Sequence, residues 1–212
     1  MKFLKRVIKT LKKTAFEESF YDVFFDHETT KSLVRVPVSY MKDPFNMFQL
    51  PRYVSNYDEA LESLISGQLS PLFFGSCVHL YALVHQRYIL TEEGLNLMHE
   101  LYQAHAFGVC PRSNCGAAAI PTSLTNTYDD GSVLLYCPCC KQLFKPSSED
   151  ELSHLDGAFI GTNFAGVFCA AYPNVVKPGP VKLEKKAYGF RIFDISQYPE
   201  VRDKYPDVFS LE

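Results

Sequence analysis

Four cysteines in two close pairs constrain the fold of this chain more than any other sequence feature. Cys110-Pro-Arg-Ser-Asn-Cys115 is followed, after 21 residues, by Cys137-Pro-Cys-Cys140. Two short loops that each offer two thiolates match the tetrahedral coordination of zinc. The spacings lie slightly outside the commonest ribbon pattern, but both loops begin with Cys-Pro. We therefore predict one Zn²⁺ per chain, bound by Cys110, Cys115, Cys137 and Cys140.

The second loop contains three cysteines, of which two are expected to bind the metal. A two-residue gap suits chelation from a single turn, which favours Cys137 with Cys140 and leaves the adjacent Cys139 as a bystander. The pairing of Cys137 with Cys139 stays open as an alternative. Four thiolates close the coordination shell and leave no position for a catalytic water, so the predicted site is structural. Zinc binding should then help to fold residues 107–145.

The cysteine count also bears on the compartment. Seven cysteines are an odd number, and the N-terminus does not resemble a secretory signal, because its lysines are interspersed rather than followed by an apolar block. We expect metal ligation in a reducing compartment, the cytoplasm and nucleus, rather than a disulfide framework. Cys77, on the apolar face of a predicted helix, and Cys169, in a strand-like run, are interpreted as buried side chains that fill the core.

The first half of the chain is predicted to be helical. Ser70-Pro71 is typical of a helix start, since a capping hydroxyl precedes proline at the first helical position. Thr91 is expected to cap a second helix that ends near Gly108. The stretch FYDVFFDHE (20–28) allows either a helix or an extended segment.

The second half changes character near residue 106. Four short runs rich in β-branched and aromatic residues lie between Pro and Gly turns, which predicts strands. They are VLLYC (133–137), GAFIG (157–161), GVFCAAY (166–172) and AYGFRIF (187–193). A strand that ends at Cys137 would bring the second cysteine loop beside the first. The two halves together predict an α+β fold, in which a helical lobe precedes a four-cysteine zinc-ribbon β lobe.

Charge is distributed unevenly along the chain. Residues 1–13 carry six Lys/Arg and no acid, so for a net charge of −3 the remaining residues sum to −9. The N-terminal segment has apolar residues at helical spacing. We expect either a surface helix that covers the core, or a helix that binds an acidic partner or a membrane surface. The mildly acidic body makes nucleic acid an unfavourable partner.

The aromatic content is high, with 17 Phe and 13 Tyr but no Trp. It indicates either a dense aromatic core or an adhesive surface, and composition leaves both open.

We recognise no catalytic constellation and expect no enzymatic activity. The chain has no glycine-rich phosphate loop and no nucleophile elbow, and its six histidines are scattered. A zinc-ribbon nucleic-acid-binding or transcription-associated protein is the alternative function. It is disfavoured because residues 107–145 set only Arg112, Lys141 and Lys145 against two aspartates.

Six stretches, in the same order, resemble the regulatory (beta) subunit of casein kinase II, a protein Ser/Thr kinase. They are YMKDPFN (40–46), HQRYILTEEG (85–94), FGVCPRSNC (107–115), LYCPCC (135–140), DGAFIGTNF (156–164) and AYGFRI (187–192). The resemblance implies a variable N-terminal extension over 1–39, a helical lobe over 40–106, a zinc-ribbon dimerisation lobe over 107–176 and a C-terminal docking tail over 177–212.

The resemblance also implies how such a chain acts. In that family the zinc ribbon makes the homodimer contact, here expected at Val109 and Pro111, and the dimer bridges two catalytic subunits in a tetramer of two plus two. A hairpin of the tail docks on the catalytic subunit, here through Tyr188, Gly189 and Phe190. Glycine permits the tight bend, and two outward aromatic side chains serve as anchors. Such a subunit modulates the stability, activity and substrate choice of the kinase.

Two features of the family are missing. Its acidic loop, associated with binding polyamines and basic regions, corresponds to LISGQLSP (64–71), which contains no acid. Its N-terminal serine–acidic autophosphorylation site is replaced by the basic segment 1–13. We expect dimerisation and docking to be kept, and acidic regulation to be lost or shifted elsewhere.

Overall fold

The computed structural model describes most of the chain. It covers residues 19–68, 71–112, 115–176 and 186–191, together with residues 200 and 204. The chain divides into two structural units, residues 1–180 and residues 181–212. The predicted helix over residues 1–13 lies outside the described residues.

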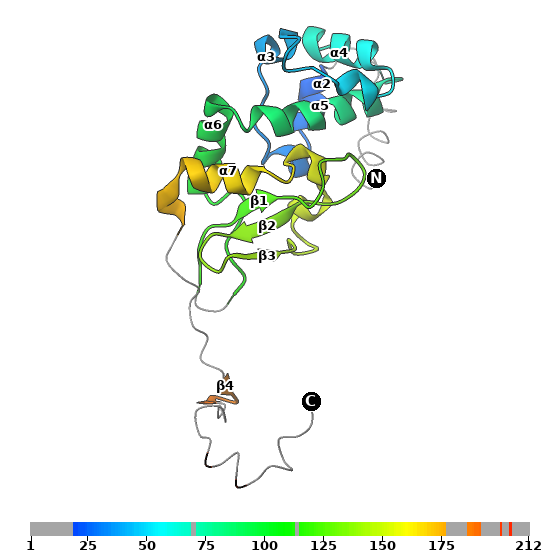
Figure 1. The fold of residues 1–212 in the computed structure, drawn as a ribbon. Coiled ribbons are helices and arrows are strands. Elements are labelled where there is room, and N and C mark those ends of the chain that lie inside the picture. The colour runs from blue at the N-terminus through cyan, green and yellow to red at the C-terminus, as the bar shows by residue number, and fades with distance from the viewer. Residues whose placement is uncertain are drawn as a thin grey trace. The chain divides into compact units, whose positions relative to one another are not determined.

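Helix α5 (Phe74–Tyr88) is the centre of the first unit. Val78, Leu80, Tyr81 and Val84 are completely buried along it, as expected for a helix covered on nearly every side. The other helices of this unit surround it or follow it in the chain. They are α2 (Phe20–Phe25), α3 (Val38–Lys42), α4 (Tyr57–Ser66), α6 (Glu92–Gln103) and α7 (Phe164–Ala171), with the 3-10 helices η1 (Glu28–Thr30), η2 (Leu50–Arg52), η3 (Glu151–His154), η4 (Gly157–Phe159) and η5 (Pro173–Val175) (Figure 1).

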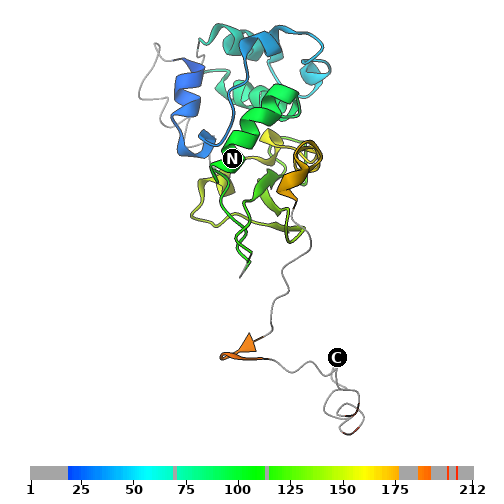
Figure 2. The ribbon, with the colours of Figure 1, turned by 90° about the vertical axis from the view of Figure 1, so that its left-hand side faces the viewer.

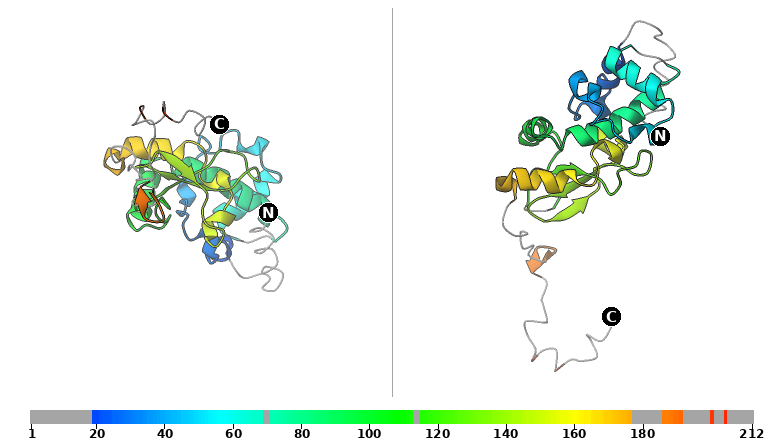
Figure 3. Two further views of the ribbon diagram at one scale, coloured as in Figure 1. Left: turned by 90° about the horizontal axis from the view of Figure 1, so that it is seen from below. Right: turned by 45° about the horizontal axis from the view of Figure 1, so that its top comes forward.

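A small antiparallel sheet completes this unit. Strand β1 (Ile120–Thr122) pairs with β2 (Leu134–Cys137), which pairs in turn with β3 (Gln142–Phe144). Helix α7 packs against β1, on the side of the sheet that faces the other helices (Figures 1 and 3). Helix α6 slopes from the helices around α5 toward this layer (Figure 2). Helices and a three-stranded sheet confirm the predicted α+β class.

The core is rich in aromatic rings and joins the helices to the sheet. The buried ring of Phe24 lies 5.3 Å from that of Phe20, 5.2 Å from that of Tyr81 and 5.9 Å from that of Phe159. Ile120 of β1 belongs to the same buried cluster. Much of the high aromatic content therefore stabilises the core.

The predicted start of α5 is wrong. Residues 71–73 form a turn, and the helix begins at Phe74. Its N-cap residue, Phe73, makes no capping hydrogen bond with its side chain. The helix therefore starts at a buried residue, Phe74, and not at a residue with a capping hydroxyl. Tertiary packing readily overrides local helix propensity.

Helix α6 begins as predicted and ends earlier than predicted. The hydroxyl of Thr91 accepts a hydrogen bond from the backbone N–H of Gly94 at 3.1 Å, which confirms the cap. The helix ends at Gln103 rather than near Gly108. His105 adopts a left-handed conformation (φ 56°), which a continuing right-handed helix does not allow.

Two of the four predicted strands in the second half are wrong. All of the run GVFCAAY except Tyr172 belongs to helix α7, which buries Phe164, Ala165 and Phe168 on one face and places Cys169 in a helix. GAFIG contains the 3-10 helix η4. A short apolar run does not distinguish a buried strand from a buried helix. VLLYC contains β2 as predicted, and the undecided stretch FYDVFFDHE begins with helix α2 over residues 20–25.

The second unit contains one described pair of strands. Strand β4 (Lys186–Ala187) pairs with β5 (Phe190–Arg191) in an antiparallel hairpin, as AYGFRIF predicted. Across the described parts of both units, every helix is too short or too polar to span a lipid bilayer.

Candidate metal centre

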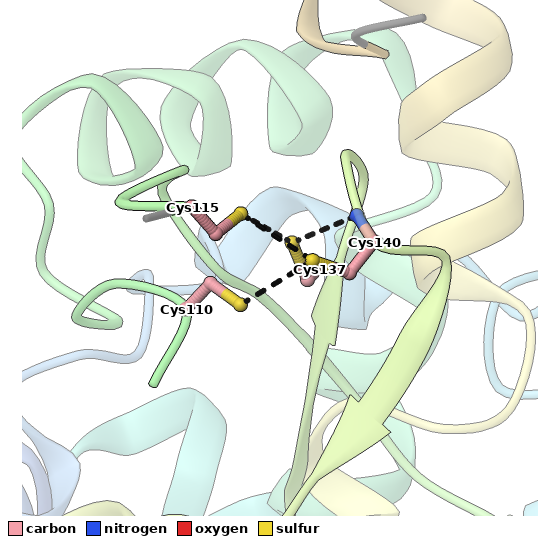
Figure 4. A group of neighbouring side chains, drawn as sticks. All are labelled: Cys110, Cys115, Cys137 and Cys140. Carbon is pink, nitrogen blue, oxygen red and sulfur yellow. Dashed lines mark hydrogen bonds between the residues drawn. The ribbon is translucent and has the colours of Figure 1, made fainter. Parts of the chain in front are cut away.

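The four predicted ligands come together in space. The Sγ atoms of Cys110, Cys115, Cys137 and Cys140 all lie within 4.8 Å of one another (Figure 4). Three of the six distances between them are 3.9 Å for Cys110–Cys140, 3.7 Å for Cys115–Cys137 and 3.4 Å for Cys115–Cys140. Among the described residues, this is the one group of cysteine, histidine and carboxylate side chains arranged to hold a metal.

The second cysteine loop is shaped by the turn between β2 and β3. Cys137 ends β2, and its Sγ lies 3.3 Å from the backbone N of Cys140, which donates to it (Figure 4). The N–H of Lys141, in a left-handed conformation (φ 55°), donates to the carbonyl of Cys137 at 2.8 Å. This tight turn points both sulfurs to the same side, which agrees with the predicted two-residue chelating gap.

The first cysteine loop is held by backbone hydrogen bonds at its base. The N–H of Cys110 donates to the carbonyl of Ala117 at 2.8 Å, and the N–H of Ala119 donates to the carbonyl of Gly108 at 3.0 Å. Gly116 has a positive φ of 59°, which glycine adopts without strain. The loop therefore returns on itself and presents Cys110 and Cys115 toward the β2–β3 turn (Figure 4).

The donor set and its dimensions fit zinc. Zinc–thiolate bonds of about 2.3 Å in a tetrahedron place neighbouring sulfurs about 3.8 Å apart. Three of the six sulfur–sulfur distances, 3.4–3.9 Å, bracket this value, and all six are within 4.8 Å. Four soft thiolates would fill the coordination shell, so a bound zinc ion would stabilise the fold and offer no open position for chemistry.

The pKa values of Cys110, Cys115 and Cys140 are shifted in different directions. Burial raises the pKa of Cys110 to about 12 and also raises the pKa of Cys140. The backbone N–H of Ala117 lowers the pKa of Cys115 to about 7. Because zinc binds thiolates, metal binding at neutral pH would release protons from this group.

Cys139 is buried but does not belong to the group of four sulfurs. The preferred pairing of Cys137 with Cys140 therefore agrees with the geometry better than the alternative with Cys139. Cys77 is fully buried in α5, as predicted, whereas Cys169 is only half-buried.

The predicted docking residues form the tip of the β4–β5 hairpin. Ala187 pairs with Phe190, so Tyr188 and Gly189 make a two-residue turn. Both have positive φ, 52° and 86°, as in the type I′ turns that suit the twist of hairpins. Tyr188 is fully exposed and Phe190 is 79% exposed. Both aromatic side chains are thus accessible at the tip.

The predicted dimer residues are also accessible. Val109 and Pro111 are both exposed at the first cysteine loop. Residues 107–176 expose further apolar side chains that sequence reasoning missed, namely Leu124, Leu143, Val167 and Val176. Val167 was missed because its segment was interpreted as a strand. A helical interpretation would have placed Val167 at the edge of the face that Phe164, Ala165 and Phe168 bury.

Comparisons with known proteins agree on one family. The family model described as "Casein kinase II regulatory subunit" matches residues 19–191. The casein kinase II subunit beta' of Saccharomyces cerevisiae is 32% identical over 196 residues, which cover 86% of this chain and 75% of that protein. The subunit beta of Schizosaccharomyces pombe is 30% identical over 195 residues (88% and 84%), and the subunit beta' of Drosophila melanogaster is 33% identical over 186 residues (83% and 84%).

Proposed function

The chain belongs to the family of casein kinase II regulatory subunits, and we propose that it forms a zinc-stabilised homodimer that holds two catalytic subunits. Members of this family are the non-catalytic part of the kinase, in agreement with the absence of a catalytic motif from the sequence. Family membership favours this function over the zinc-ribbon nucleic-acid-binding alternative.

The proposed zinc ion is structural, with one ion per chain bound by the four clustered cysteines. The sulfur cluster supports the proposal, because its dimensions match a zinc tetrahedron. Without a metal ion, four thiols so close together would contribute little to the stability of the fold. Zinc coordination would tie the first cysteine loop to the β2–β3 turn and so shape the surface between them.

The proposed dimer contact lies on this zinc-binding part of the chain. Exposed Val109 and Pro111 begin the first cysteine loop, and Leu143 is exposed on β3. Exposed apolar side chains lose their contact with water when two copies associate through them. The proposal therefore links metal to assembly: a chain that cannot bind zinc should dimerise poorly.

The proposed contact with each catalytic subunit is the β4–β5 hairpin. Its exposed aromatic pair, Tyr188 and Phe190, carries the proposal most directly, because aromatic anchors on a rigid turn concentrate binding energy in a small interface. Through this contact the chain would modulate the stability, activity and substrate choice of the kinase.

A binding experiment with purified casein kinase II catalytic subunit tests the function. Replacement of both Tyr188 and Phe190 by alanine should weaken binding at least about tenfold, since each anchor contributes on the order of 2 kcal/mol. The matched control is Leu72→Ser, which removes another highly exposed apolar side chain. If the double variant and the control bound equally well, hairpin docking would be refuted.

Two further proposals concern location and the N-terminal segment. We expect the chain in the cytoplasm and nucleus, which fluorescence microscopy of a tagged chain tests. Residues 1–13, with six cations, are proposed to bind an acidic partner or a membrane surface in place of the family's lost acidic loop. Deletion of residues 1–13 that left localisation, kinase activity and assembly unchanged would contradict this.

A further inference from the structure

Among the described residues of 19–176, all Phe and Tyr side chains but three are buried or half-buried, and these three lie in one segment. Phe45, Phe48 and Tyr53 are 84%, 66% and 63% exposed. Gln49 adopts a left-handed conformation (φ 67°) between the exposed Phe48 and the buried Leu50. Clusters of exposed aromatic side chains mark interaction surfaces. The aromatic residues therefore form both the core and an exposed surface. We call the stretch that carries this surface, residues 45–53, the 45–53 segment.

A pocket lies beside the 45–53 segment. Its volume is about 300 Å³, at the small end of the range for ligand sites. Leu50 and Tyr53 of the segment line it, together with His79, Leu83, Gln86 and Arg87 of α5 and residues 126–128. The pocket is large enough to take one large side chain of a partner, and the exposed Tyr53 forms part of its lining.

One wall of the pocket is fixed by contacts of α5. The ring of His79 stacks on Tyr128 with 4.5 Å between ring centroids. Gln86 Nε2 donates to the carbonyl oxygens of Ala158 at 2.7 Å and Asn126 at 3.3 Å. A wall held in this way requires little reordering when a ligand enters, which favours binding.

The lining carries one positive charge and no carboxylate. Arg87 Nη1 donates to the carbonyl of Asn46 at 2.6 Å, and among the described residues no Asp or Glu forms an ion pair with Arg87. Burial lowers the pKa of His79, so its ring is neutral near pH 7. Arginine presents a planar fork that matches a carboxylate. The charge of Arg87 therefore selects for an acidic ligand.

We propose that the 45–53 segment and this pocket form a docking site for a short acidic peptide segment of another protein. A leucine or aromatic side chain of that peptide fills the pocket between Leu50, Tyr53 and Leu83. A neighbouring Asp or Glu of the peptide pairs with Arg87. The site shares no residue with the β4–β5 hairpin or the cysteine loops. It would therefore recruit a partner in addition to the catalytic subunit, and it does not depend on kinase docking.

The experiment starts from a random eight-residue peptide library displayed on phage and selected against the full-length protein. Enriched peptides should combine a leucine or aromatic residue with a nearby Asp or Glu. The best peptide, labelled with fluorescein, is then titrated with each variant and followed by anisotropy. Arg87→Gln should weaken binding about tenfold and Arg87→Lys by less, because lysine keeps the charge. Increased salt should also weaken binding.

One further variant and a control test the pocket without disturbing the Arg87–Asn46 hydrogen bond. Tyr53→Ala removes an exposed ring from the pocket and should weaken binding about fivefold or more, with an unchanged thermal unfolding midpoint. Leu72→Ser is the matched control and should bind as the unaltered protein does. The proposal is overturned if selection enriches no peptide, or only basic or uncharged ones. It is equally overturned if Tyr53→Ala and Arg87→Gln leave affinity unchanged, or if a second copy of the chain occupies the site.

Discussion

The buried ring of His85 in α5 joins two distant segments, with its Nδ1 2.6 Å from the carbonyl oxygen of Phe159 in η4. The other ring nitrogen, Nε2, accepts the backbone N–H of Val34 at 3.2 Å. Both hydrogen bonds are satisfied together by the neutral tautomer that carries its proton on Nδ1. A second proton, on Nε2, would face the N–H of Val34 and lose that hydrogen bond. Stability should therefore depend on pH through this one side chain.

Burial lowers the pKa of His85 in the folded protein to about 4, from an ordinary value of 6.5. Between these values the unfolded chain binds more protons at this site than the folded chain. The contribution of neutral His85 to the free energy of unfolding is thus complete above pH 6.5 and is lost as pH falls toward 4. The loss should be about 1 kcal/mol per pH unit. Urea unfolding of the protein and of His85→Asn at several pH values measures it. Equal pH dependence in the two proteins would contradict this role.

Gly94 permits the close approach of α6 to the end of α5. A Cβ atom at this position would lie 2.1 Å from the carbonyl oxygen of Tyr88 and 2.8 Å from Cα of Ile89, so the backbone would have to move. Gly94→Ala should lower the free energy of unfolding by about 3 kcal/mol. Gly166→Ala, in the exposed part of α7, is the control, because a Cβ there meets no atom within 4 Å. It should be neutral or stabilise by up to about 1 kcal/mol. Denaturant unfolding distinguishes the two, and similar effects would refute the close approach.

The cysteine cluster predicts a clear division among the cysteine variants. Cys110→Ser or Cys140→Ser should reduce bound zinc from about one ion per chain toward none, because each removes one of four ligands. Cys139→Ser, two residues from Cys137 and outside the cluster, should retain the metal. Elemental analysis of the purified variants measures this. Retention of zinc by Cys140→Ser together with its loss from Cys139→Ser would instead support the alternative pairing.

Gly189 adopts a φ of 86° at the tip of the β4–β5 hairpin. A β-branched residue is strained in this conformation by about 1–2 kcal/mol, whereas asparagine tolerates left-handed backbone better. Gly189→Val should therefore weaken binding to the catalytic subunit several-fold more than Gly189→Asn. Surface plasmon resonance with the catalytic subunit measures both. Equal affinities would show that the bend does not position Tyr188 and Phe190.

The features that the sequence predicts well are those with fixed chemistry and spacing. Three predictions depend on interactions between residues that are close in the sequence, and short stretches encode such interactions. They concern the ligand loops, the Thr91 cap and the strand that leads into Cys137. GVFCAAY failed because apolar residues alone do not report whether a helix or a strand is buried. The helix start predicted at Ser70-Pro71 was wrong because the helix begins where Phe74 packs into the core, and this packing is not visible in the local sequence.

The pocket beside the 45–53 segment was beyond sequence reasoning for another reason. Tyr53, Arg87 and Tyr128 come from three separate parts of the chain and meet only after α5 is packed. Composition indicated a surplus of aromatic residues but could not divide them between core and surface. That division depends on which side chains α5 covers, and this follows from tertiary contacts.

The zinc-dependent dimer is tested most directly by native mass spectrometry of the reduced, purified chain together with metal analysis. The expected species contains two 24.1 kDa chains and two zinc ions, and it should separate into monomers when a chelator removes the metal. A metal-free protein that stays folded and dimeric would contradict the account.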